Sequence, residues 1–409
     1  MARVMTNARR PERVDHGPDA FRLAERMGLL GTETAFEVLV RARALEQQGR
    51  DVVHLEIGEP DFDTPAHVKE AAKQALDEGW THYGAAAGLP ELRQAIADHV
   101  ARTRAIAVDP AQVVVTPGAK PVLFFSLLAL VQPGDEVILP DPGFPIYESM
   151  IRFAGATPVP LTLREERAFA FDPAELPALF SRRTRLIILN SPHNPTGGVL
   201  DRPALEAVAA AAQEHDVTVL ADEIYSSILY GGEHVSITSL PGMAERTILL
   251  DGFSKTYAMT GWRLGYGVFP RPLVAGIERL MVNSVSCTAS FVQRAGLAAL
   301  RGPQEPVTAM VAEFQRRRAL IVDGLNAIPG IRCLEPQGAF YAFPNVRELG
   351  LGSDELADRL LQEAGVAALA GTAFGSAGEG YLRLSYANSI PNLQEALDRL
   401  ASAARQYRA

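Results

Sequence analysis

Short apolar runs alternate with longer helix-forming segments through the middle of the chain, and this alternation constrains the fold more than any other feature. The runs lie at residues 113–116, 136–140, 186–190, 217–221, 247–250 and 264–269. Segments rich in alanine and leucine separate several of them, as at 203–215. Continuous apolar strands that alternate with helices are typical of a mostly parallel sheet with helices on both faces. The sequence therefore predicts an α/β fold whose ligands gather beyond the carboxyl ends of the strands.

The pattern changes after residue 301, which indicates a second, smaller α+β unit. Helical patterns alternate there with short strands at 339–343 and 381–385. We expect four parts: a polar, disordered arm over residues 1–20, an N-terminal segment (21–60) that contributes to the small unit, a large domain (61–301) and a small domain (302–409).

Composition excludes several classes of protein. The 39 Lys and Arg residues against 48 Asp and Glu give a net charge of −9, which argues against binding to nucleic acid or anionic membranes. The longest apolar stretch, 122–131, is about half of what a bilayer span needs, and the N-terminal arginines precede no apolar signal core. The only cysteines, Cys287 and Cys333, form no disulfide framework and no CxxC metal pair. We expect a cytoplasmic protein without a metal.

Primary amines are scarce, because lysine occurs only at Lys69, Lys73, Lys120 and Lys255. Lys255 follows the apolar run 247–250, at a carboxyl edge of the predicted sheet. Partial desolvation there would lower its pKa and leave an amine able to form a Schiff base with an aldehyde. Arg263, eight residues on, could hold a phosphate. The alternative is an ordinary lysine in a surface loop, and the residue alone does not decide between the two.

A second candidate is the turn between the run 113–116 and the helix that begins near Val122. Free N–H groups at a helix N-terminus attract anions, and Gly118 and Ala119 would let a phosphate approach closely. The chain has neither a Walker motif nor GxGxxG here, which disfavours nucleotide and nicotinamide cofactors. A plain tight turn is the alternative.

Polar and aromatic residues also follow the other runs. An ionised Asp222 could keep a ring nitrogen protonated, and Tyr225 could donate a hydrogen bond to a phenolate oxygen, which Asn194 could also bind. Phe144 could stack on an aromatic cofactor or belong to the core. Arg383, within an alternating strand, needs an anionic partner, either a substrate carboxylate or a nearby Asp or Glu.

The joint order of these motifs resembles the fold-type I pyridoxal-phosphate enzymes, and within them the class I and II aminotransferases of the aspartate aminotransferase family. The resemblance runs from about residue 32 to about residue 405. The blocks that carry it include Asn194-Pro-Thr-Gly197, Asp222-Glu-Ile-Tyr225, Ser254-Lys255, Thr260-Gly-Trp-Arg263 and Arg383-Leu-Ser-Tyr386.

The resemblance implies pyridoxal 5′-phosphate as the cofactor and gives each residue a role. Lys255 would carry the cofactor covalently and then serve as general base. Asp222 would pair with the ring nitrogen, and Tyr225 with Asn194 would bind the ring oxygen. Phe144 would stack on the ring. The phosphate would be held by Gly118, Ala119, Lys120, Ser254 and Arg263, although Gly252 stands where many relatives have a further phosphate-binding serine.

The resemblance also implies a homodimer with shared active sites, because Tyr83 matches a tyrosine that reaches the phosphate of the neighbouring subunit. Arg383 would bind the substrate α-carboxylate with Gly58 and Asn194. Lys120 resembles a lysine that meets the distal carboxylate in one aspartate-preferring subgroup. A second phosphate cation and a charge at the rim of the site are the alternatives for Lys120.

The resulting hypothesis is an aminotransferase that moves an amino group from an L-amino acid to a 2-oxo acid by a ping-pong mechanism, with a preference for acidic substrates such as aspartate and glutamate. Two alternatives stay open. One is another reaction of the same cofactor, as in a β-lyase, decarboxylase or cyclase. The other is a protein that binds pyridoxal phosphate without turnover.

Overall fold

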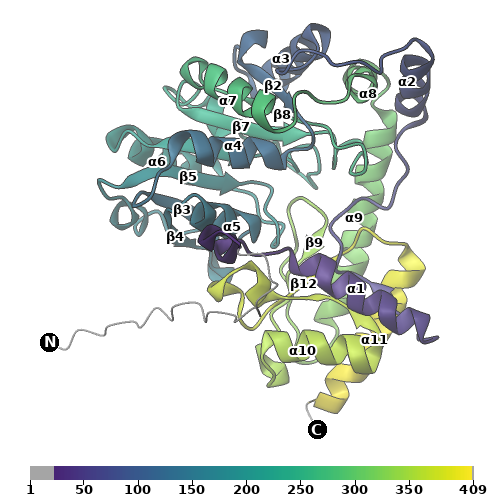
Figure 1. Cartoon of the computed structure of the whole chain (residues 1–409). Helices are drawn as coiled ribbons and strands as arrows, with labels where there is room; N and C mark the ends of the chain where they lie inside the picture. The colour runs from purple at the N-terminus through teal and green to yellow at the C-terminus, as the bar shows by residue number, and fades with distance from the viewer. Residues whose placement is uncertain (1–22, 408–409) are drawn as a thin grey trace, which may run out of the picture.

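The computed structural model describes residues 23–407, in which an α/β unit and a smaller α+β unit lie side by side (Figure 1). The arm predicted over residues 1–20 lies outside the described residues. Within residues 23–407, no helix combines the length and the apolar character that crossing a membrane requires.

Seven strands form the sheet of the larger unit, in the order β2-β8-β7-β6-β5-β3-β4. Their bounds are β2 Val113–Thr116, β3 Glu136–Asp141, β4 Thr157–Thr162, β5 Thr184–Asn190, β6 Thr218–Asp222, β7 Thr247–Gly252 and β8 Gly265–Val268. β8 runs opposite to the other six strands of this sheet. The α/β fold with a mostly parallel sheet is thus confirmed.

Helices on both faces bury the sheet between two apolar cores. Successive residues of a strand point to opposite faces, so Val114 joins one core while Val113 and Val115 join the other. The helices of this unit are α2 Ala66–Asp77, α3 Pro90–Arg104, α4 Lys120–Leu130, α5 Ile146–Phe153, α6 Arg202–Glu214, α7 Arg271–Ser284 and α8 Ser290–Arg301. Burial on both faces explains why the strands read as continuous apolar runs in the sequence.

The smaller unit is built from both ends of the described chain. Its strands are β1 Val53–His54, β9 Tyr341–Ala342, β10 Val366–Ala367, β11 Leu369–Ala370 and β12 Leu382–Ser385. Its helices are α1 Thr34–Gln47, α9 Glu305–Asn326, α10 Ser353–Arg359 and α11 Ile390–Tyr407. β1 pairs in parallel with β10, and β12 lies between β11 and β9 in an antiparallel sheet. The boundaries of the four parts given above stay a prediction.

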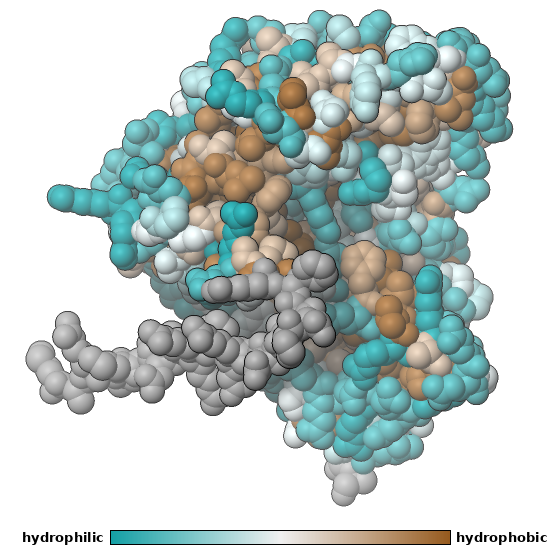
Figure 2. Space-filling model, in the orientation of Figure 1, coloured by the Kyte–Doolittle hydropathy of each residue, from teal (hydrophilic) through white to brown (hydrophobic). Residues whose placement is uncertain are grey.

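Apolar side chains gather on both sides of the hollow between the two units (Figure 2). On α1 they include Phe36 and Val40, which are 56% and 68% exposed. The carboxyl ends of β5, β6 and β7 carry residues that line this hollow, as expected for ligand sites of open α/β sheets.

Candidate active site

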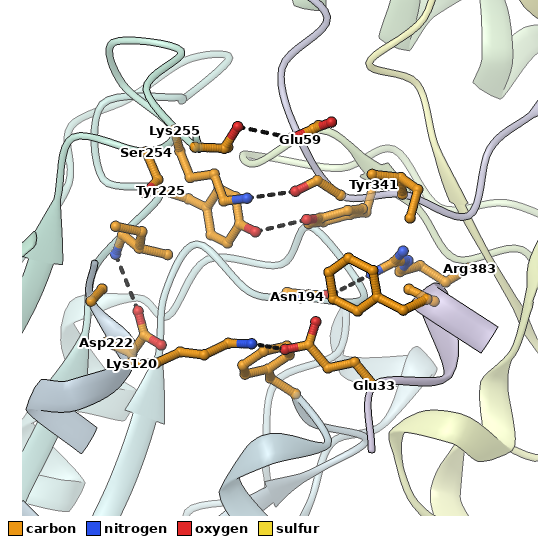
Figure 3. Close-up of a pocket in the computed structure, with 18 of the residues that line it drawn as sticks. Glu33, Glu59, Lys120, Asn194, Asp222, Tyr225, Ser254, Lys255, Tyr341 and Arg383 are labelled. Carbon is orange, nitrogen blue, oxygen red and sulfur yellow. Dashed lines mark hydrogen bonds and ion pairs between the residues drawn. The ribbon is translucent and has the colours of Figure 1, made fainter. Parts of the chain in front are cut away.

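A cavity of about 840 Å³ lies between the carboxyl edge of the large sheet and the smaller unit (Figure 3). It brings together eleven of the residues singled out in the sequence: Gly58, Ala119, Lys120, Phe144, Asn194, Asp222, Tyr225, Ser254, Lys255, Arg263 and Arg383. Gly118 adjoins the cavity behind Arg263. Tyr83 is 90% exposed and is not part of the cavity lining that this chain supplies.

Lys255 lies in the turn after β7, with its ammonium inside the cavity. Its Nζ donates a hydrogen bond to the carbonyl oxygen of Gly58 and lies 5.9 Å from the centre of the Tyr225 ring. Burial lowers the pKa of Lys255 to about 8, while the nearby Glu59 carboxylate opposes this shift. A neutral amine, able to act as nucleophile or base, is therefore accessible near neutral pH.

Asp222, the last residue of β6, is a buried carboxyl group. The Tyr147 hydroxyl donates a hydrogen bond to its Oδ2 at 2.6 Å, and the Ile224 N–H donates to its Oδ1 at 3.3 Å. Burial nevertheless raises the pKa of Asp222 to about 6. A cation placed against this carboxyl group would favour its ionised form, so the site suits a protonated ring nitrogen. Tyr147 was not identified from the sequence, although it ends the same segment as Phe144.

Glu223, the next residue, has its own buried partner. Its Oε2 lies 2.9 Å from Arg104 Nε, and Arg104 Nη2 lies 2.7 Å from Asp251 Oδ2. Although burial alone raises the pKa of Glu223, His234 and Arg104 lower it to about 2. Two adjacent acids at the end of a buried strand are costly unless each has a partner. The ion pair with Arg104 stabilises the Glu223 carboxylate, whereas the Asp222 carboxyl group faces the cavity.

The turn between β2 and α4 forms a cradle for an anion. Gly118 has φ +85°, and a Cβ atom there would lie 2.1 Å from Arg263 Nη2. A Cβ atom on Gly265 would lie 2.5 Å from the Ala119 nitrogen, so the turn also packs tightly against β8. The Arg263 guanidinium, fixed by a 2.9 Å hydrogen bond from Nη1 to the Thr260 carbonyl oxygen, thus lies beside the N-terminus of α4. A guanidinium next to free N–H groups at a helix start suits a phosphate.

Arg383, on β12, is a buried cation without a carboxylate partner among residues 23–407. Its Nη1 lies 3.4 Å from Asn194 Oδ1, its Nη2 bonds the Glu56 carbonyl oxygen, and its buried Nε has no partner within that range. The guanidinium lies 4.6 Å from the Tyr341 ring centre and 5.1 Å from that of Phe374. A buried charge of this kind needs an anion, and the cavity is where one can reach it.

Asn194 and Tyr225 are held by neighbours that the sequence did not single out. Asn190, at the end of β5, accepts a 2.9 Å hydrogen bond from the Asn194 N–H. The Tyr225 hydroxyl shares a 2.7 Å hydrogen bond with the Tyr341 hydroxyl. A Cβ atom at Gly58 would lie 2.2 Å from the Tyr341 hydroxyl, which explains why this position is glycine. Tyr341 carries no sequence signal beyond its place in a predicted strand.

Lys120 points toward the wall of the cavity that the N-terminal segment supplies. Its ammonium forms an ion pair with Glu33, the residue before α1, and lies 5.6 Å from the Phe144 ring centre. Phe144 packs edge-on against Tyr147 at 5.6 Å.

Comparisons with known proteins agree with this geometry. The family model for aminotransferases of class I and II matches residues 50–400. The aspartate aminotransferase of Pyrococcus horikoshii is 42% identical over 93% of this chain and 97% of its own. The arginine–pyruvate transaminase of Pseudomonas aeruginosa is 42% identical over 91% of this chain and 95% of its own. The structure of the Thermus thermophilus aspartate aminotransferase with maleate has a TM-score of 0.89 and 40% identity, and covers 94% of this chain and all of the other.

The chain therefore belongs to the class I and II aminotransferases. It is an enzyme that acts on amino acids and oxo acids. The family resemblance, the fold and the aminotransferase activity predicted from the sequence are confirmed, and they leave no need for the lyase or non-catalytic alternatives. The roles of the individual site residues stay predictions.

Proposed function

We propose that the cavity binds pyridoxal 5′-phosphate and that the enzyme transfers the amino group of an L-amino acid to a 2-oxo acid in a ping-pong cycle. The observation that carries the proposal is the convergence of four groups in one cavity. These are the amine of Lys255, the buried Asp222 carboxyl group, the cradle beside Arg263 and the guanidinium of Arg383, which has no carboxylate partner among residues 23–407. Each matches one part of the cofactor or of an amino acid: aldehyde, ring nitrogen, phosphate and α-carboxylate.

Lys255 supplies both the attachment point and the base. When bound, pyridoxal phosphate supplies an aldehyde that condenses with amines and a ring that delocalises an electron pair left at Cα. With its amine freed by an incoming amino acid, Lys255 Nζ would be the group that takes up the Cα proton and later gives it back. The pKa of about 8 suits this task, because general bases work best near the operating pH.

The remaining residues hold charges in place. Asp222, kept in position by the Tyr147 hydroxyl, stays ionised against the ring nitrogen. Tyr225 and Asn194 bind the ring oxygen, and Phe144 lies against the ring. Arg383 binds the α-carboxylate in the pocket that Asn194 and Gly58 complete.

We further propose acidic amino acids among the substrates, with Lys120 as the cation for their distal carboxylate. The support is its place in the cavity lining, together with the names of the Pyrococcus and Thermus relatives. We also propose a homodimer in which Tyr83 reaches the phosphate of the neighbouring subunit. The cytoplasmic location stays a prediction.

Replacing Lys255 with alanine tests the proposal. We expect Lys255→Ala to lose the visible absorbance of lysine-bound cofactor, and to form pyridoxamine phosphate from amino acid alone at least about a thousandfold more slowly, because the base is gone. The matched control is Lys73→Ala on the exposed face of α2, which should keep both properties. Full activity of a folded Lys255→Ala variant would refute the assignment.

A further inference from the structure

Lys120, the cation that we assign to the substrate side chain, already forms an ion pair with a carboxylate of the protein, that of Glu33. Glu33 and Lys120 come from opposite walls of the cavity, and Figure 3 shows their charged ends pointing toward each other. The Lys120 side chain is 50% exposed and that of Glu33 is 16% exposed. Because Glu33 is the less accessible member, its carboxylate is directed into the cavity rather than into solvent.

The backbone on both sides of Glu33 is anchored, so the contact is set by the fold. The Gly31 N–H donates a 2.9 Å hydrogen bond to Ser149 Oγ on α5. α1, which begins at Thr34, packs on the smaller unit through Val38, Ala42 and Leu45. Glu33 thus lies in the short connection between two fixed points.

Glu33 also lies in the field of the other cations of the site. Its carboxylate acts electrostatically on both Lys255 and Arg383. An acidic amino acid brings two carboxylates, which need two cations. Arg383 has no carboxylate partner among the described residues, whereas Lys120 already has Glu33. A bound dicarboxylate must therefore separate this pair or leave its distal charge unpaired.

We propose that Glu33 is a specificity-determining residue that competes with the distal carboxylate of an acidic substrate for Lys120. With the pair intact, the side-chain pocket is electrically neutral and accepts uncharged side chains. With the pair opened, Lys120 is free to bind an acidic side chain. The inference rests on the proposed function and extends it to the choice between substrate classes.

The test compares two non-reacting ligands on the cofactor-loaded protein. Maleate carries two carboxylates, and 3-phenylpropionate carries one beside an apolar group. Their dissociation constants are measured by calorimetry or by titration of the cofactor absorbance. We expect Glu33→Gln to tighten maleate binding about three- to tenfold, the range for a partly exposed ion pair, and to leave 3-phenylpropionate within about twofold. The KM for aspartate should fall relative to that for phenylalanine.

Two further variants sharpen the result. Glu37→Gln removes the same charge from the exposed surface of α1, one turn from Glu33, and should change neither ligand. In a Lys120→Met background, Glu33→Gln should no longer tighten maleate binding, because the contested cation is absent.

Three outcomes would overturn the inference. The first is an unchanged maleate affinity in Glu33→Gln. The second is an equal change for both ligands, which would indicate a long-range charge effect. The third is the same change in Glu37→Gln. None of these outcomes bears on the proposed function, which is contradicted separately if the wild-type protein forms no pyridoxamine phosphate from any amino acid.

Discussion

At the scale of single residues, burial in the cavity shifts both Lys255 and Asp222 toward their neutral forms. Burial lowers the pKa of Lys255 to about 8 and raises that of Asp222 to about 6. The amine is thereby prepared for reaction, whereas the carboxyl group is left short of a positive partner. The cofactor ring nitrogen would supply that partner.

The pH dependence of stability reports on the Asp222 carboxyl group. Its folded pKa of about 6 lies above the ordinary value of 3.8 for an aspartate, so between these two pH values the folded state binds more protons than the unfolded state. The free energy of unfolding of the cofactor-free protein should therefore fall as pH rises from about 4 to about 6, by about 1–3 kcal/mol. Asp222→Asn should remove this contribution, as measured by urea unfolding across the range. If the free energy of unfolding of Asp222→Asn depended on pH as it does in the wild type, the raised pKa of Asp222 would be contradicted.

The sequence predicted the charged residues of the site better than the aromatic ones. Lys255 and Asp222 stand out because charge is rare near the end of an apolar run, and Arg383 stands out because a cation within an apolar strand needs an anionic partner. Tyr147 and Tyr341 do not, because an aromatic ring within an apolar segment suits the core equally well. Only the packing of distant segments directs the Tyr147 hydroxyl to Asp222, 75 residues away.

At the scale of elements, the turn from β2 into α4 connects backbone shape with anion binding. Gly118 adopts positive φ, and its missing side chain makes room for the Arg263 guanidinium. The sequence identified this turn from its small residues. It did not identify the edge strand β4, because Pro158 and Pro160 interrupt the β-type pattern. Proline is tolerated there because an edge strand has only one neighbour to hydrogen-bond.

Alanine substitutions at Gly118 and Gly134 distinguish the effect of backbone strain from the effect of losing the anion-binding turn. Gly118→Ala should weaken cofactor binding roughly tenfold or more, because the new methyl group displaces Arg263 from the turn. Gly134→Ala is the matched control, since Gly134 has φ +93° but open space around its Cα. It should lose about 1 kcal/mol of stability and keep its cofactor affinity. The dissociation constant of pyridoxal phosphate is measured for both variants by fluorescence titration. Equal dissociation constants would contradict the proposal that the Gly118 turn binds the phosphate.

At the scale of the whole molecule, the exposed apolar side chains support the proposed homodimer. Phe36, Val40, Val282 and Val285 are 40–68% exposed, and Tyr83 is 90% exposed. Contiguous exposed apolar groups, such as Phe36 and Val40 one turn apart on α1, mark surfaces that bind other proteins. Periodicity could not predict which of them face a partner, because that depends on a surface formed only after folding.

Sharing of the active site is tested through Tyr83. If its hydroxyl reaches the phosphate in the neighbouring subunit, Tyr83→Phe should raise the dissociation constant of the cofactor about ten- to a hundredfold, the loss of one hydrogen bond to a charged group. The dimer measured by light scattering should persist. Tyr407→Phe on α11 provides the control, because its hydroxyl bonds Glu363 on the smaller unit. A monomeric wild-type protein would refute shared sites.

The contact between the segment that follows β1 and strand β12 has a consequence for how the enzyme is made. The Glu56 carbonyl oxygen that accepts from Arg383 precedes it by 327 residues, and the Leu55 carbonyl oxygen accepts from the Ser385 N–H. A ribosome must therefore release almost the entire polypeptide before these neighbours can meet. The site that we propose for the substrate carboxylate, at Arg383, is therefore completed only after nearly the whole chain has been synthesised.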